Sequence, residues 1–128
     1  MSLTTSAVTM MLPVHDVDRA RTFYSECLGL ECTGTNDEGG ATYSLDGSAT
    51  LELLPRPDSR PTGSTAMSFE VDDVSAEITQ LEGRGVTFED YDLPGLTTVD
   101  HVAEMGNHKA AWFKDPDGNV ICLHQESG

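Results

Sequence analysis

The sequence predicts an α+β fold made of two βαβββ repeats, which form a cupped mixed sheet with the helices on its outer face. Two observations support this fold class. An internal repeat relates the two halves of the chain by a constant offset of 57 residues, and each half has one helical apolar period followed by segments with strand character. We therefore expect a single domain over residues 1–128, with a first unit at 6–56, a linker at 57–65 and a second unit at 66–126.

The repeat is clearest around the two predicted helices. Its matching positions are Val14 with Val71, Asp16 with Asp73, and Val17 with Val74. Each aspartate comes just before an apolar period, where its side chain can accept hydrogen bonds from the first N–H groups of a helix. The first helix should run from Val17 to Gly29, where it ends, and the second from Val74 to either Gly83 or Gly85.

Strands are expected after each helix. The predicted segments are 30–34, 40–47 and 49–55 in the first half, and 86–92, 108–115 and 119–125 in the second. An Asp-Gly pair at 46–47 and the sequence DPDG at 115–118 are typical of tight turns between strands. The connection at 91–109 is longer than an ordinary hairpin loop, so we expect it to form a lid over the cup.

Composition excludes several classes of partner. Seven Lys and Arg residues against 22 Asp and Glu residues give a net charge of −15, which repels both nucleic acid and anionic membrane surfaces. The longest apolar stretch is too short to cross a bilayer. Three cysteines without a CxxC pair indicate free thiols in a reducing compartment, so we expect a cytoplasmic protein.

Residues 14–31, 69–74 and 110–125, together with the repeat, resemble the vicinal oxygen chelate superfamily. This superfamily contains glyoxalase I, extradiol dioxygenases, and fosfomycin and bleomycin resistance proteins. The resemblance implies the glyoxalase/bleomycin resistance/dioxygenase fold and a homodimer. It does not specify the reaction or the ligand, because one fold supports many functions.

In the metal-dependent members of this superfamily, the resemblance implies four metal ligands near the centre of the cupped sheet. Those positions fall on Thr9, Glu52, Ala66 and Cys122 in this sequence. Threonine is a feeble ligand and alanine is none, so only two useful donors remain. We therefore expect no metal at the standard position and no cofactor, with a divalent metal as the alternative if nearby histidines substitute.

Other residues are candidates for binding a small molecule. Strand alternation places Glu52 and Cys122 toward the cavity, where Glu52 is also the candidate general base if the protein is an enzyme. The connection contributes Tyr91, His101, Met105 and His108, and the strand after it contributes Trp112. Alternation leaves open whether Trp112 or Phe113 faces the cavity. His124 is expected at the rim.

Three hypotheses about function follow. The first is a metal-independent protein that binds a small amphipathic or cationic molecule in the sheet cavity, similar to the bleomycin resistance branch. The alternative is a metal-dependent lyase, isomerase or dioxygenase with displaced ligands that include Glu52. A third is an interaction module whose cavity is unused. Whether the chain is an enzyme stays open at the level of sequence.

Overall fold

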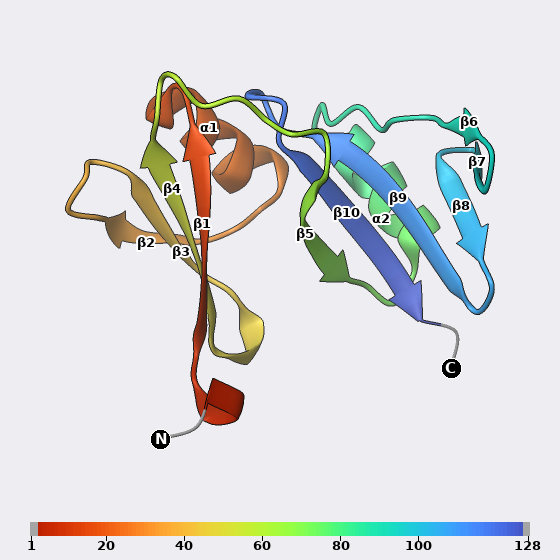
Figure 1. Ribbon diagram of the computed structural model, residues 1–128, viewed down its shortest axis with the longest axis horizontal. Helices are drawn as coiled ribbons and strands as arrows, with labels where there is room; N and C mark the ends of the chain where they lie inside the picture. Colours follow the sequence, from red (N-terminus) through yellow and green to blue (C-terminus); the bar gives the residue numbers. More distant parts are fainter. Residues whose placement is uncertain (1–2, 127–128) are drawn as a thin grey trace. The chain divides into compact units, whose positions relative to one another are not determined.

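A computed structural model describes residues 3–126 of the protein (Figure 1). The chain folds into two compact units, one extending to Arg60 and the other beginning at Pro61. Each unit combines a mixed sheet with one α-helix, which confirms the predicted α+β class and the repeat. In the described part of the chain, no helix is long and apolar enough to span a membrane.

Unit 1 contains a four-stranded sheet. Its elements are a 3-10 turn at Leu3–Thr5, β1 at Val8–Val14, α1 at Val17–Thr22, a π-helical segment at Phe23–Cys27, β2 at Cys32–Thr35, β3 at Ala41–Ser44, a 3-10 turn at Asp46–Ser48 and β4 at Ala49–Pro55. The strand order is β1-β4-β3-β2, with β1 parallel to β4 and the other neighbours antiparallel.

Unit 2 contains a six-stranded sheet. Its elements are β5 at Thr65–Glu70, α2 at Val74–Glu82, β6 at Asp92–Leu93, β7 at Leu96–Val99, β8 at Val102–Met105, β9 at His108–Lys114 and β10 at Val120–Glu126. The strand order is β5-β10-β9-β8-β7-β6, and β5 is parallel to β10. Figure 1 shows α2 lying along one face of this sheet, behind β9 and β10.

The two helices begin as the sequence predicts. The Asp16 carboxylate accepts a hydrogen bond from the Arg19 N–H at 3.2 Å, and the Asp73 carboxylate accepts one from the Ala76 N–H at 3.1 Å. Both aspartates are therefore N-caps at equivalent points of the repeat. The first helical segment ends before Gly29. This residue has a φ of 75°, a backbone conformation that costs little energy only for glycine.

The core of unit 1 lies between its sheet and the helical segment. Tyr24 and Tyr43 are fully buried, with ring centroids 6.3 Å apart, and Leu51 and Leu53 of β4 are fully buried with them. The Tyr43 hydroxyl lies 2.9 Å from the Ser25 hydroxyl. Burial disfavours the phenolate and raises the pKa of Tyr43 above its ordinary value, so this hydroxyl stays neutral and hydrogen-bonded.

The core of unit 2 follows the same plan. Val74, Ile78 and Leu81 of α2 are buried, which confirms the predicted apolar stripe of this helix. Phe88 packs edge to face against Phe113, with ring centroids 5.3 Å apart. These contacts place Phe113 on the face of the sheet that α2 covers.

The connection at 91–109 differs from the prediction of a lid. It forms the short antiparallel strands β6, β7 and β8, which extend the sheet beyond β9 (Figure 1). Positive φ angles at Gly95, Asp100, His101 and Gly106 make the tight turns between these strands. Pairing in a sheet satisfies the backbone N–H and C=O groups that a long loop would leave to other partners.

The strand expected at 86–92 is also shorter than predicted. The structure has a single bridge there, between Phe88 and Phe113. Val86 and Phe88 of this segment are buried. β8 pairs with β9 only at residues 108–110, and this segment meets β9 further along, where the Glu89 N–H donates to the Trp112 carbonyl at 2.8 Å.

The DPDG sequence is a structural turn that joins β9 to β10. The buried Asp115 carboxylate accepts hydrogen bonds from the Asp117 N–H, the Asn119 N–H and the Asn119 side-chain amide, each at 2.9 Å. Gly118 has a φ of 89° and donates its N–H to the Asp115 carbonyl at 3.0 Å. The turn fixes the alignment of the two strands that carry most of the candidate site.

We predict that Asp115→Ala destabilises the protein by about 3 kcal/mol, because it leaves several buried donors without an acceptor. Urea unfolding followed by circular dichroism would measure the change. Asp58→Ala, at an exposed turn position, is the matched control and should change the free energy of unfolding by less than about 0.5 kcal/mol. Equal stabilities of the two variants would contradict this role for the turn.

A second prediction concerns the close approach of β3 and β4. A Cβ added at Gly40 would lie 1.7 Å from the Leu53 carbonyl oxygen, which is fixed in a central strand. Gly40→Ala should therefore destabilise the protein by about 2 to 3 kcal/mol in thermal or urea unfolding. Nothing lies within 4 Å of a Cβ at Gly34, so a Gly34→Ala variant with the same loss would refute the steric explanation.

Candidate functional site

Each sheet has one face covered by its own helix and one face, called here the open face, that the helix leaves uncovered. In unit 1 the buried side chains of β1 and β4 are Leu12, Val14, Leu51 and Leu53. Because alternate residues point to opposite sides, Thr9, Met11 and Glu52 belong to the open face. Met11 is directly beside Glu52 in the parallel pair of β1 and β4.

Glu52 has a polar neighbour on this open face. The Thr42 hydroxyl, on the next strand, donates a hydrogen bond to the Glu52 carboxylate at 3.1 Å. Glu52 is partly exposed, so its charge keeps contact with water. The geometry agrees with the predicted orientation of Glu52 and makes it a hydrogen-bonded anion on an otherwise uncharged part of the sheet.

In unit 2 the open face carries Cys122 and Trp112, which are directly opposite each other on β10 and β9. Phe113 lies on the other face, against Phe88, so the structure decides which of the two aromatic residues shares the face of Cys122. Ser68 of β5 is the neighbour of Cys122 on its other side. Ala66 lies at an irregularity in β5, where the register with β10 shifts by one residue.

Trp112 and Tyr91 form an aromatic pair. Their ring centroids are 5.6 Å apart and their planes make an angle of 82°, an edge-to-face arrangement. Both side chains are partly exposed. Burial raises the pKa of Tyr91 above its ordinary value, and the charge of Glu89 adds to this shift, so its phenol is a neutral hydrogen-bonding group. The pair is an amphipathic surface that suits an apolar ring with polar substituents.

The thiol of Cys122 is buried in this surface. Burial raises the pKa of Cys122, while hydrogen bonds with Ser68 and the Ala111 backbone oppose the shift. The protonated thiol behaves as a small apolar group, and it is a poor metal ligand until it loses its proton. The four standard ligand positions thus hold an exposed Thr9, a hydrogen-bonded Glu52, an exposed Ala66 and this thiol.

The remaining predicted contacts are divided between the two faces of unit 2. His101 lies against α2, with its Nε2 atom 3.3 Å from a Glu82 carboxylate oxygen and its Nδ1 atom 3.1 Å from an Asp90 carboxylate oxygen. It lines a groove of about 390 Å³ along that helix. His108 begins β9 on the same face as Trp112, and Met105 is its neighbour on β8.

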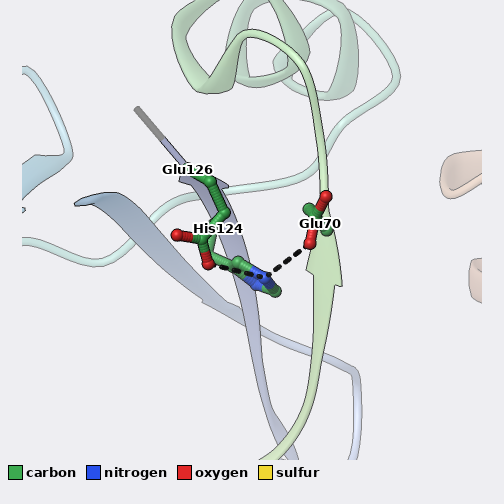
Figure 2. Close-up of side chains that lie close together, drawn as sticks. All are labelled: Glu70, His124 and Glu126. Carbon is green, nitrogen blue, oxygen red and sulfur yellow. Dashed lines mark ion pairs between the residues drawn. The ribbon is translucent and has the colours of Figure 1, made fainter. Parts of the chain in front are cut away.

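A cluster at the ends of β5 and β10 was missed by the sequence analysis. Figure 2 shows Glu70, His124 and Glu126 with their side chains directed toward one another. One potential ligand atom from each lies within 4.8 Å of the other two. The sequence carries a signal for part of it, because Cys122, His124 and Glu126 alternate along one strand, but the nearness of Glu70 depends on pairing between strands distant in sequence.

Comparison with solved structures identifies proteins that are similar over almost the whole chain. TnmS3, an antibiotic binding protein from Streptomyces sp. CB03234, is 27% identical, with 99% of this chain and 100% of that chain covered and a TM-score of 0.71. A superfamily member from Sphaerobacter thermophilus DSM 20745 is 26% identical, with 95% and 98% covered and a TM-score of 0.73.

A glyoxalase/bleomycin resistance protein from Streptomyces sp. CB03234 is 29% identical, with 94% of this chain and 100% of that chain covered and a TM-score of 0.68. Among curated proteins, no significant match is found. The family profile of the Glyoxalase/Bleomycin resistance protein/Dioxygenase superfamily matches residues 6–123. Because this family model covers residues 6–123, nearly the full sequence, the chain belongs to the Glyoxalase/Bleomycin resistance protein/Dioxygenase superfamily.

Proposed function

We propose that the protein binds a small amphipathic or cationic molecule on its open faces, without a metal at the four standard positions. The observation that carries this proposal is the surface formed by Tyr91, Trp112 and Cys122, which combines two partly exposed rings with a buried protonated thiol. Aromatic rings with a polar edge bind flat, partly apolar molecules at a small entropic cost. The similarity to an antibiotic binding protein supports the same class of ligand.

Charge favours a cation among such molecules. The net charge of −15 attracts positively charged ligands toward the protein as a whole. On the open face of unit 1, Glu52 is an anion whose Thr42 partner is a neutral hydroxyl, so its charge is available to pair with a ligand. A basic glycopeptide antibiotic of the bleomycin type combines flat heteroaromatic rings with positive charge and is a suitable probe.

The alternative of a metal-dependent lyase, isomerase or dioxygenase requires an ion close to Glu52. The described neighbours of Glu52 are Thr42, with which it shares a hydrogen bond, and Met11, beside it on β1. Neither is a ligand that holds a hard or borderline divalent ion. Binding without chemistry is therefore the function that these contacts favour.

Two further properties belong to the proposal. We expect a homodimer, because β1 and β5 each lie at an edge of their own sheet and an exposed edge strand gains from pairing or cover. We also expect a cytoplasmic location, since the thiols Cys27, Cys32 and Cys122 are free. Analytical ultracentrifugation at several concentrations would measure the oligomeric state.

The ligand prediction can be tested by calorimetry, with fluorescence as a second signal because Trp112 is the single tryptophan of the chain. Metal-free bleomycin should bind saturably and change the emission of Trp112. Tyr91→Ala should weaken binding by about tenfold, which corresponds to the loss of one aromatic contact. Glu52→Gln should weaken binding of the cationic probe by about threefold, while binding of an uncharged aromatic analogue should not change.

Glu26→Gln is the matched control for Glu52→Gln, because Glu26 is an exposed carboxylate on the helical segment of the same unit. It should bind the probe as the wild type does. If bleomycin, a polyamine and an uncharged aromatic analogue all give no heat at millimolar concentration, the proposed binding function is refuted.

A further prediction uses the thiols as reporters. Because burial raises the pKa of Cys122, its thiolate fraction at pH 8 is small and grows only as the pH rises toward that pKa. Iodoacetamide should therefore alkylate Cys122 more slowly than the less buried Cys27 and Cys32, as followed by peptide mass spectrometry. Bound ligand should slow the alkylation of Cys122 further and leave the alkylation of Cys27 unchanged. Equal protection of both thiols would argue against a ligand on the surface formed by Tyr91, Trp112 and Cys122.

A further inference from the structure

We propose that Glu70, His124 and Glu126 form a binding site for a divalent transition-metal ion on the open face of unit 2. The His124 Nε2 atom lies 3.7 Å from a Glu70 carboxylate oxygen and 4.0 Å from a Glu126 carboxylate oxygen (Figure 2). An ion held at about 2.0 to 2.2 Å from each ligand needs ligand atoms roughly 3 to 3.5 Å apart. Small side-chain rotations at this partly exposed cluster would bring the three groups to that separation.

The backbone places these side chains together. Glu70 is the register neighbour of His124 in the parallel pair of β5 and β10. Glu126 follows His124 by two residues, so strand alternation puts it on the same face. Two rigid strands therefore fix the three Cα positions, and only the side-chain torsions remain to be ordered when an ion binds.

Neighbouring residues orient two of the proposed ligands. The Ser68 hydroxyl lies 2.6 Å from His124 Nδ1, which leaves Nε2 directed toward both carboxylates. Donation from Nδ1–H to the Ser68 oxygen would fix the tautomer that has a free lone pair on Nε2. His108 lies 2.5 Å from the second oxygen of Glu126 and holds that carboxylate in place. Such outer contacts are typical of metal sites, where they raise affinity.

The chemistry of the donor set selects the ion. One imidazole nitrogen and two carboxylate oxygens suit borderline divalent ions such as Zn²⁺, whereas Mg²⁺ prefers oxygen donors alone and strict octahedral geometry. Two carboxylates that share so small a space repel each other, and a divalent cation removes that repulsion. The site is separate from the four standard ligand positions, since none of its three residues occupies one of them.

A second histidine cluster in the same unit shows why geometry matters. His101 also contacts two carboxylates, but Glu82 lies at Nε2 and Asp90 at Nδ1, on opposite sides of the ring. One ion cannot receive a ring nitrogen lone pair and both of those carboxylates together. At His124 both carboxylates lie on the Nε2 side. The two clusters have the same composition, one histidine and two carboxylates, and only the His124 cluster is proposed to bind metal.

The test is calorimetric titration of untagged, chelator-treated full-length protein with ZnCl₂. We expect one Zn²⁺ per chain, no displacement by a hundredfold excess of Mg²⁺, and a loss of affinity of about tenfold or more in both His124→Gln and Glu70→Gln. Ser68→Ala should lose affinity by a smaller factor. His101→Gln is the matched control and should bind as the wild type does, with circular dichroism showing that every variant is folded.

Three results would overturn the proposal. The first is the absence of saturable Zn²⁺ binding by the wild type up to about 1 mM, and the second is unchanged Zn²⁺ binding by His124→Gln. The third is an equal loss of Zn²⁺ affinity in His124→Gln and His101→Gln. Unchanged binding by His124→Gln would mean that the ion binds elsewhere on the protein. Bleomycin binding without Zn²⁺ binding would leave the proposed function standing while removing this site, so the two proposals fail independently.

Discussion

The structure depends on one constraint, which is that each sheet buries a single face under its helix while strand alternation sends every second residue to the other face. On β10 this rule separates the core residues Ile121 and Leu123 from Cys122 and His124. A shift of one residue in the pairing of β10 with β9 would exchange the two sets and bring the His124 imidazole into the core. The hydrogen-bonded Asp115 turn prevents that shift, so the turn also determines what the open face displays.

The acidic side chains have different surroundings on the open faces of the two units. On the open face of unit 1 the Glu52 carboxylate accepts a hydrogen bond from a neutral hydroxyl, that of Thr42. At the end of β10, carboxylates are gathered around histidine, and the imidazoles of His124 and His108 moderate their repulsion only when protonated. The first arrangement suits a large cation whose charge is spread over many atoms. The second suits a small ion of high charge density, which must be coordinated from several directions.

Much of the fold follows from short-range patterns. The caps at Asp16 and Asp73, the stripe of α2 and the strand β4 are local features, so periodicity and turn chemistry predict them. The strands within 91–109 escaped prediction because they are short and because one of their turns has positive φ at Asp100 and His101 instead of at a glycine, so the sequence carries no Gly signal there. The neighbours Glu70 and His124 are 54 positions apart, and only the register of two parallel strands brings them together.

The open face of unit 2 changes in character along β10. Cys122 is 6% exposed and lies beside Trp112, whereas the side chain of His124, two residues further, is 30% exposed and contacts carboxylates. Two residues of a strand span about 6.6 Å, which is shorter than most antibiotics. A molecule of that size stacked on Trp112 is long enough to reach the charged end of the strand. An ion bound there would neutralise charge beside that molecule, so metal and a cationic ligand would oppose each other through simple electrostatics, without any change of conformation.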